Sequence, residues 1–348
     1  MQCVMIRRTP SRRRPLTPSP RPTSTAPVLV LLDRTHISRR PLDIKDVRAF
    51  EYVKTIGESH YGSIQLCRNP DNGGYVAVKV IHRAKVRIAQ RHKRILQEVH
   101  IMRILQPHPN VIEFLGTAKT KQNIYVCLEA CVVGDLFGLL TEQRTLPEPQ
   151  TRYCISHIAN ALEHLHCNYV VHRDVKPENI VLHNDGRLKL IDLGYSKIVY
   201  DRTQSMLGTI SYMAPAIVKG MAYAHEVDVW ALGVLAYECL SGRTPFYDAD
   251  EHVEMKKIVH GSYELIPETS TAATQFMSSA LEPNMELRMQ TASCARRHSW
   301  ISNARDMKPL KLPSFKTVHA RFNYVDNAPW QVCEEDAYVG DLEWDRFL

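Results

Sequence analysis

The sequence predicts an α+β fold, in which a small, mostly antiparallel β region with one main helix precedes a larger, mostly helical region. Three observations predict it. Short strand patterns begin at residue 50, one long helical pattern follows them, and helical patterns prevail beyond Gly134. Strands that are segregated from helices in this way are typical of α+β folds rather than of alternating α/β folds.

The strand patterns come first along the chain. Apolar side chains alternate with polar ones, and β-branched and aromatic residues are frequent, over residues 50–56, 62–67 and 75–81. Asp71-Asn72-Gly73-Gly74 separates the last two runs. Such Asn/Gly segments favour the tight turn of a hairpin, so we expect an antiparallel sheet.

The helical patterns follow. In residues 86–105 apolar side chains recur every three or four positions, which predicts a helix with one buried face (Ile95, Val99, Met102 and Leu105). Residues 151–166 and 227–240 have the clearest amphipathic or buried helical patterns of the second region.

The formal charge of +7 comes from the N-terminal segment. Residues 1–40 hold nine Arg, no Lys and only Asp33, a balance of +8, so that residues 41–348 sum to about −1. The basic charge therefore says almost nothing about what the folded part binds, and we expect no specific nucleic-acid partner. Nucleic-acid binding through the Arg-rich tail is a lesser alternative. The Arg-, Pro- and Ser-rich composition predicts a disordered basic tail over residues 1–46. It also fits a mitochondrial transit peptide, although seven prolines disfavour the amphipathic helix of such a signal.

Cysteine usage and hydropathy bear on the compartment. The nine cysteines form no C-x-x-C pair and have no His partners at zinc spacing. This pattern indicates reduced thiols and a cytoplasmic protein, with the nucleus as the alternative. The longest aliphatic run, residues 26–32, is too short for a membrane span, which needs roughly 20 apolar residues.

The strongest chemical signal is the segment 171–179, Val-His-Arg-Asp-Val-Lys-Pro-Glu-Asn, together with Asp192-Leu193-Gly194. Phosphoryl transfer needs a carboxylate that accepts the hydroxyl proton, a cation on the γ-phosphate and two oxygen donors for Mg²⁺. The two segments supply such a set: Asp174, Lys176, Asn179 and Asp192.

These segments resemble the protein kinase family, whose catalytic and metal-binding signatures are H-R-D-x-K-x-x-N and D-[FL]-G. The resemblance implies a bilobal protein kinase fold over residues 50–301, with residues 50–131 as small lobe and hinge and residues 132–301 as large lobe. It implies that ATP and Mg²⁺ are bound, that Asp174 is the catalytic base, that Asn179 and Asp192 bind Mg²⁺, and that Lys176 contacts the γ-phosphate. A Lys two residues after the Asp indicates serine/threonine specificity.

Residues 57–64, Gly-Glu-Ser-His-Tyr-Gly-Ser-Ile, resemble the glycine-rich loop that covers the ATP phosphates. The loop departs from the family pattern at Ser59 and Ile64, and a Ser at the second glycine position is expected to restrict backbone approach and weaken nucleotide binding. Lys79 would hold the α- and β-phosphates and pair with Glu98. The resemblance implies these ATP-binding residues in the small lobe: Ile56, Gly57, Glu58, Ser59, Gly62, Ile64, Ala77, Lys79 and Glu98.

Residues 124–137 resemble the strand and hinge that bind adenine. By this resemblance Leu128 is the gatekeeper, Glu129 and Cys131 offer backbone hydrogen bonds, and Asp135 reaches the ribose.

The later segments resemble the end of the activation segment and the core of the large lobe: residues 208–215, 228–233, 245–246 and Arg288. The family's A-P-E triplet reads Ala214-Pro215-Ala216, so the glutamate that pairs with Arg288 is absent. A buried guanidinium without its carboxylate costs roughly 3 to 5 kcal/mol, unless it relaxes toward water or finds another partner.

Residues 79–98, residues 202–209 and a C-terminal tail at 302–348 resemble the AGC group, and within it the catalytic chains of cyclic-nucleotide-dependent kinases. His108-Pro109-Asn110 and His298-Ser299-Trp300 also suit calmodulin-dependent-like kinases.

The resemblance also implies a substrate class. Asp135, Glu178 and Glu238 match carboxylates that bind substrate arginines, so we expect Arg-rich substrates. Other residues would contact the peptide at and after the target hydroxyl: Met206, Thr209, Ile210 and Met213.

Arg173 beside the catalytic base marks kinases whose activation loop is ordered by a phosphate. Ser205 is the candidate phosphosite, with Thr203 behind it. The expected partners are protein substrates that are basic around the target Ser or Thr, and a separate regulatory subunit or an upstream activating kinase. The alternative function is a pseudokinase or docking scaffold with weak or no phosphotransfer, which Ser59 and Ala216 suggest.

Overall fold

The computed structural model describes residues 50–59, 61–86, 89–205, 207–302 and 307–310, all of which belong to one unit, residues 35–348. The predicted tail at 1–46 and most of the predicted tail at 302–348 lie outside the described residues. The predicted fold class is confirmed, because an antiparallel sheet with one main helix precedes a helical region.

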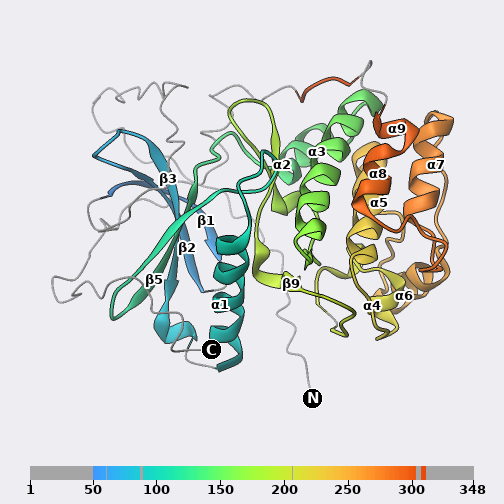
Figure 1. Cartoon of the computed structure of the whole chain (residues 1–348). Helices are drawn as coiled ribbons and strands as arrows, with labels where there is room; N and C mark the ends of the chain where they lie inside the picture. Colours follow the sequence, from blue (N-terminus) through green and yellow to red (C-terminus); the bar gives the residue numbers. More distant parts are fainter. Residues whose placement is uncertain (1–49, 60, 87–88, 206, 303–306, 311–348) are drawn as a thin grey trace, which may run out of the picture. The chain divides into compact units, whose positions relative to one another are not determined.

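A five-stranded antiparallel sheet forms the small lobe, with the spatial order β1-β2-β3-β5-β4 (Figure 1). The turn predicted between its second and third strands is present, because Gly73 has a φ of +69° and donates its amide to the Asn69 carbonyl at 2.8 Å. The strands are β1 (Glu51–Ser59), β2 (Gly62–Arg68), β3 (Tyr75–His82), β4 (Phe114–Lys119) and β5 (Asn123–Glu129).

The helix α1 (Ala89–Ile104) lies beside this sheet and buries Ile95 and Val99 (Figure 1). The sequence predicted a helix from residue 86, but α1 begins at Ala89. Residues Arg83–Val86 form a separate 3₁₀ turn, η2, which is tied to the β4–β5 turn because the Arg83 amide donates to the Gln122 carbonyl at 2.8 Å.

The large lobe is built around α3 and α5, which pack against each other (Figure 1). Helix α5 is mostly apolar and almost wholly buried, including its carboxylates Glu226 and Asp228, which identifies it as the core helix of this lobe. The helices are α2 (Leu136–Gln143), α3 (Glu148–Cys167), α4 (Pro215–Val218), α5 (Glu226–Ser241), α6 (Glu251–His260), α7 (Thr271–Ala280), α8 (Ala292–Arg297) and α9 (Ser299–Ser302). Within the described ranges, no helix has the length and apolar character of a membrane span.

Short strand pairs and 3₁₀ turns hold the loops that carry the polar motifs. Strand β6 pairs with β9 and β7 with β8, so the segment 172–176 and the segment after β8 are fixed at both ends. The elements are β6 (Val170–Val171), η3 (Pro177–Asn179), β7 (Ile180–Leu182), β8 (Leu188–Leu190), η4 (Leu193–Tyr195), β9 (Lys197–Ile198) and η5 (Ile210–Tyr212).

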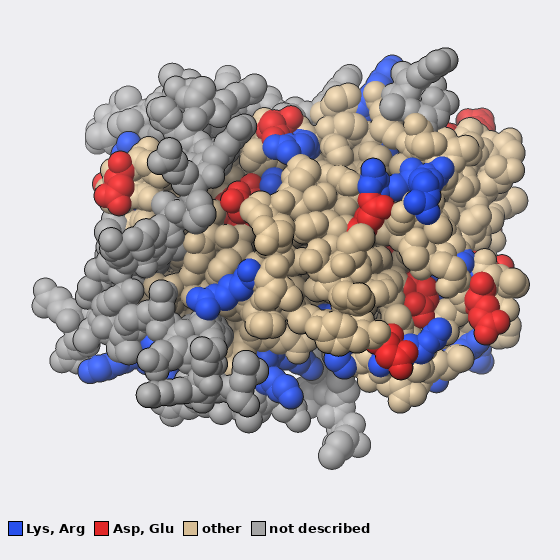
Figure 2. All heavy atoms as spheres, viewed as in Figure 1, with Lys and Arg blue, Asp and Glu red and all other residues tan. Residues whose placement is uncertain are grey.

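Charged side chains of both signs are interspersed on the face shown in Figure 2. The described part of this face carries no continuous basic patch, which agrees with the small net charge of residues 41–348.

Candidate active site

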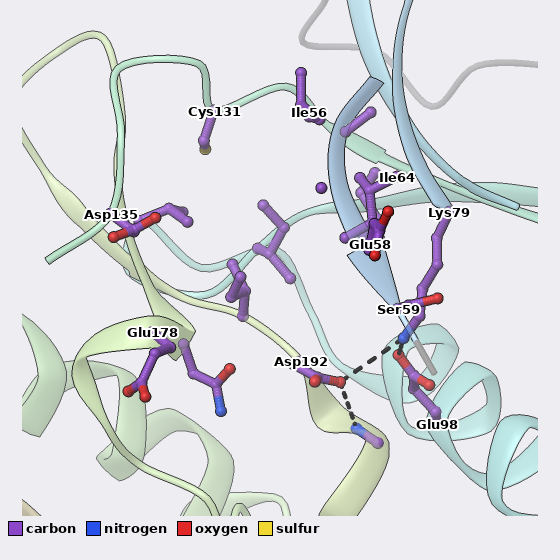
Figure 3. A pocket seen from close by; sticks show the side chains of 18 of the residues that line it. Ile56, Glu58, Ser59, Ile64, Lys79, Glu98, Cys131, Asp135, Glu178 and Asp192 are labelled. Carbon is purple, nitrogen blue, oxygen red and sulfur yellow. Dashed lines mark hydrogen bonds and ion pairs between the residues drawn. The ribbon is translucent and has the colours of Figure 1, made fainter. Parts of the chain in front are cut away.

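A cleft of about 900 Å³ lies between the sheet and the large lobe (Figure 3). Its lining draws on both lobes. The structure brings most of the predicted nucleotide-site residues together here: Ile56, Gly57, Glu58, Ser59, Ile64, Ala77, Lys79, Glu98, Leu128, Glu129, Cys131, Asp135, Lys176, Asn179 and Asp192.

Lys79 on β3 links the two lobes through two carboxylates. Its Nζ donates to Glu98 Oε1 on α1 at 2.6 Å and lies 3.7 Å from Asp192 Oδ1, as Figure 3 shows. The side chains of Lys79 and Glu98 are only 12% and 9% exposed. Burial opposes the charge on Lys79, but the attraction of Glu98 and Asp192 outweighs it and raises the Lys79 pKa above its ordinary value. The amine therefore stays charged in the cleft.

Asp192 follows β8 in a left-handed backbone conformation, with a φ of +60°. A non-glycine residue in this region is strained, and such strain persists only where the surroundings hold it. Here Oδ1 accepts the Gly194 amide at 3.1 Å and so caps the turn η4. Burial would raise the pKa of Asp192, but Lys79 and the Gly194 amide lower it, so the carboxylate is charged.

Asp228 on α5 fixes the loop that carries Asp174. Its buried carboxylate accepts hydrogen bonds from the backbone N–H groups of His172 and Arg173, each at 2.8 Å. It also lies 2.9 Å from Nε2 of the His166 ring. Burial opposes its charge, yet these donors lower its pKa below the ordinary value. Arg173 is held with a φ of +68° by this arrangement.

Asp174 is 4% exposed, and three polar side chains contact its carboxylate. Asn179 Nδ2 donates to its Oδ2 at 2.8 Å, Lys176 Nζ lies 3.0 Å from the same oxygen, and the Thr209 hydroxyl donates to Oδ1 at 3.2 Å. Lys176 also donates to Thr209 at 2.8 Å. A carboxylate and an ammonium group are thus held together beside the cleft, which Lys176 and Asn179 line and Asp174 does not.

The remaining oxygen donors suit Mg²⁺. Asn179 Nδ2 donates to Asp174, so its Oδ1 is the atom that can bind a metal, and the Asp192 carboxylate is 41% exposed. Magnesium is often held by one or two protein oxygens together with phosphate oxygens. Within the part of the chain that the structure describes, no group of three or more acidic, His or Cys side chains forms a self-contained metal site. The pair Asn179 and Asp192 therefore fits a metal that a phosphate ligand shares.

The other end of the cleft is apolar. Ile56, Ile64, Ala77 and Leu128 line it as predicted, and the sequence reasoning missed two residues of the large lobe that also line it, Val181 and Ile191. Val181 stands two positions after Asn179, and Ile191 stands one position before Asp192. This closeness in sequence to predicted site residues is the signal that could have identified them.

Three predicted nucleotide-site residues have further structural roles. Gly62 does not line the cleft; a side chain there would meet the Val80 carbonyl at 1.9 Å, so glycine permits the β2–β3 approach. The buried Glu129 carboxylate contacts Lys189 at 2.6 Å, and Asp135 Oδ1 accepts the Gly138 amide at 2.6 Å and caps α2.

The predicted peptide-binding residues lie in the large lobe. Glu178 is exposed and lines the cleft, whereas Glu238 on α5 is largely buried and accepts the Tyr212 hydroxyl. Burial and the nearby charge of Glu178 raise the pKa of Glu238 from 4.5 to about 7. Ile210 is partly buried, Met213 is buried, and Met206 lies outside the described residues.

Ser205 lies against a basic side chain. Arg173 Nη1 donates to its hydroxyl at 3.2 Å, and the Tyr223 hydroxyl donates to its carbonyl at 2.8 Å. Thr203, the second candidate phosphosite, is buried and accepts Lys197 Nζ at 2.7 Å. Ser205 is thus the more accessible of the two hydroxyls.

Arg288, which lacks the usual glutamate, is buried and has found other partners. It donates to the backbone carbonyls of Glu282 at 2.8 Å, Pro283 at 3.2 Å and Glu226 at 3.4 Å, and lies 4.9 Å from the Trp230 ring centre. Burial lowers its pKa to about 10, against the attraction of Glu226 and Glu282. The penalty of a guanidinium with no partner therefore does not apply to this chain.

Comparison with known proteins agrees with this geometry. A family model described as "Protein kinase domain" matches residues 50–301. The chain is 32% identical to cAMP-dependent protein kinase catalytic subunit 3 of Drosophila melanogaster, over 78% of this chain and 48% of that protein. It is 33% identical to Aurora kinase of Schizosaccharomyces pombe, over 74% and 72%, and 32% identical to Serine/threonine-protein kinase Sgk3 of Rattus norvegicus, over 78% and 54%. The chain spans about half the length of most of these relatives.

Proposed function

Because this chain belongs to the protein kinase family, we propose that it is an ATP-dependent serine/threonine protein kinase. One observation carries the proposal. Lys79 and Glu98 from the small lobe meet Asn179 and Asp192 from the large lobe around a single cleft, and Asn179 and Lys176, which also line it, hold Asp174 beside it. Phosphoryl transfer relies on positioning and on electrostatic stabilisation, and this set supplies both.

The chemistry assigned to each residue follows from its contacts. Asp174 accepts the proton of the substrate hydroxyl as that oxygen attacks the γ-phosphorus of ATP, and the bond to the bridging oxygen breaks, so that ADP leaves with the electron pair. Lys176, held 3.0 Å from Asp174, places positive charge where the phosphoryl group passes. Mg²⁺ held by Asn179 and Asp192 would offset phosphate charge, while Lys79 orients the triphosphate.

Two observations support a Ser or Thr acceptor. Lys176 occupies the position two residues after Asp174, and it is bridged to Asp174 by Thr209. Several relatives, including Sgk3, are named as serine/threonine kinases.

We further propose that substrates are rich in Arg before the target hydroxyl. Asp135 and Glu178 line the cleft, and Glu238 lies close enough to Glu178 for the two carboxylates to repel each other. A substrate guanidinium would relieve this repulsion. Ile210 and Met213, with Met206, would contact an apolar residue after the hydroxyl.

A peptide array tests this substrate class. We expect the wild type to prefer peptides with Arg on the N-terminal side of Ser or Thr, and Glu178→Gln and Glu238→Gln to lose that preference while still phosphorylating neutral peptides. Glu286→Gln, which neutralises an exposed carboxylate that does not line the cleft, is the matched control. A wild type that shows no preference for Arg rules out this assignment.

Regulation through Ser205 is proposed on the same grounds. A phosphate on this hydroxyl would pair with Arg173, whose backbone is held by the Asp228 carboxylate and whose side chain is held by the Tyr195 carbonyl. An upstream kinase that modifies Ser205, or a separate regulatory subunit, is the partner that such regulation implies.

A cytoplasmic location is also proposed. The seven described cysteines are all free thiols, which supports this location.

A further inference from the structure

Glu226, the first residue of α5, places a carboxylate close to positively charged groups from two other segments. Its side chain is only 8% exposed, and its Oε1 accepts a hydrogen bond from the Ala224 amide at 3.0 Å. The same oxygen lies 3.7 Å from Nη1 of Arg202, which belongs to the loop after β9. Because a buried carboxylate needs hydrogen-bonding or charged partners, these contacts explain how Glu226 is accommodated in the core.

Arg202 is part of a loop that is docked beside the start of α5. Its guanidinium is 48% exposed and also donates to the Ala222 carbonyl at 3.1 Å. The next residue, Thr203, exchanges two backbone hydrogen bonds with Tyr223, each at 2.9 Å. The loop is therefore held by its backbone at one residue and by a cation at the residue before it.

The second cation near Glu226 is the buried Arg288. Its Nη1 donates to the Glu226 carbonyl at 3.4 Å. Burial lowers the pKa of Arg288, and the attraction of the Glu226 carboxylate opposes this effect. Arg202 reaches the same region, since its Nη1 lies 3.7 Å from Met285 Sδ. One buried carboxylate thus attracts two guanidinium groups whose segments are far apart in the sequence.

We infer that Glu226 is a positioning residue, which holds the loop 199–205 against the start of α5 by pairing with Arg202. Ion pairs between exposed side chains contribute little, but here one partner is almost wholly buried, so solvent and salt screen the pair less. The unmodified side chains make this contact, so it needs no phosphate on Ser205.

The loop 199–205 leads into the segment that carries Thr209 and Ile210, which are proposed to contact the peptide. A loop that is released from α5 leaves these residues less well placed. The effect on peptide binding rests on the proposed function, whereas the docking of the loop does not.

Hydrogen exchange of the full chain without nucleotide, measured by mass spectrometry, tests the docking. Arg202→Gln should raise the exchange rates of the Thr203 and Tyr223 amides about tenfold, because these amides join the loop to the residues before α5. Glu226→Gln should raise them by a similar factor. Arg202→Lys keeps the charge and should stay within about threefold of the wild type. Glu286→Gln, which removes an exposed carboxylate, is the matched control and should change neither rate.

Steady-state kinetics test whether the docked loop positions the peptide. KM for an Arg-rich peptide should rise about tenfold in Arg202→Gln and in Glu226→Gln. KM for ATP should be unchanged, because neither residue lines the cleft. The double variant should resemble each single variant, because removing either partner already breaks the pair.

Three results would overturn the inference while leaving the kinase function intact. Arg202→Gln with wild-type exchange rates shows that the pair does not hold the loop. Effects that multiply in the double variant show that the two residues act independently. Exchange that rises throughout α5 in Glu226→Gln as much as at Thr203 shows a purely structural role. Since exchange requires no turnover, a wild type that transfers no phosphate overturns the proposed function alone, and the exchange rates still decide whether Glu226 holds the loop.

Discussion

The ionised Glu238 carboxylate destabilises the folded protein, and a bound Arg-rich substrate would relieve this effect. Burial in α5 and the charge of Glu178 raise its pKa from 4.5 to about 7. The folded protein therefore binds this proton more tightly than the unfolded chain does. Since the folded state holds more protons between pH 4.5 and 7, stability contributed by this group falls as the pH rises through that window.

The magnitude follows from the pKa difference. The pKa of Glu238 is about 2.5 higher in the folded protein than in the unfolded chain. At about 1.4 kcal/mol for each pKa unit, ionising Glu238 above pH 7 lowers the free energy of unfolding by roughly 3 kcal/mol. The side-chain amide of a Glu238→Gln variant cannot ionise, and its carbonyl can accept the Tyr212 hydroxyl as the carboxylate does. The variant should therefore be more stable than the wild type by roughly 3 kcal/mol at pH 8, and by less than about 1 kcal/mol at pH 5.

The assay is denaturant unfolding of both proteins between pH 5 and pH 8, with Glu286→Gln as the control for the loss of an exposed carboxylate. The same variant should lose affinity for Arg-rich peptide. For the wild type, KM for that peptide should fall about tenfold from pH 6 to pH 8, because the ionised fraction of a group with a pKa of about 7 rises by that factor. A stability difference that stays constant across the pH range, or a pH dependence of KM that Glu238→Gln retains, refutes the reasoning.

Two further predictions concern the ion pair on α1 and the activation segment. Glu98→Gln leaves the buried Lys79 with Asp192 as its nearest carboxylate. The free energy of unfolding should therefore fall by roughly 3 kcal/mol, and KM for ATP should rise. A variant with unchanged thermal unfolding would count against the pairing of Lys79 with Glu98. Ser205→Ala should lower the rate of peptide phosphorylation more than Thr203→Ala does, because Arg173 contacts the Ser205 hydroxyl. Phosphopeptide mass spectrometry, with rates measured on the same samples, checks this. Equal rates for Ser205→Ala and the wild type would exclude Ser205 as the regulatory site.

The polar residues of the site could be predicted from the sequence because their spacing is local. Asp174, Lys176 and Asn179 lie within six positions of one another between two short strands, and Asp192 stands two positions after the strand β8. Lys79 was predicted from the resemblance to the protein kinase family, because a lone Lys in a strand pattern does not by itself indicate a binding site. The resemblance also implied that these residues meet: Lys79, Lys176, Asn179 and Asp192 line one cleft, and Asp174 contacts Lys176 and Asn179 beside it.

What the sequence did not reveal depends on contacts between distant segments. The raised pKa of Glu238 requires both its burial in α5 and the approach of Glu178, 60 positions away in the chain. Arg288 is stabilised by backbone carbonyls, which carry no side-chain signature that a pattern could reveal. Glu129 was expected to act through its backbone, but the end of β5 meets β8, so its carboxylate is buried against Lys189.

The most direct test of the central claim is the rate of γ-phosphoryl transfer from ATP, with Mg²⁺, to an Arg-rich Ser peptide by the wild type and by Asp174→Asn, with ATP binding measured on the same samples. We expect the wild type to transfer phosphate, and Asp174→Asn to bind ATP comparably while transferring it about 10² to 10⁴ times more slowly, since a positioned general base contributes that much. Transfer by Asp174→Asn at the wild-type rate would contradict the assignment of the base. A wild type that binds ATP but transfers nothing would favour a docking scaffold instead.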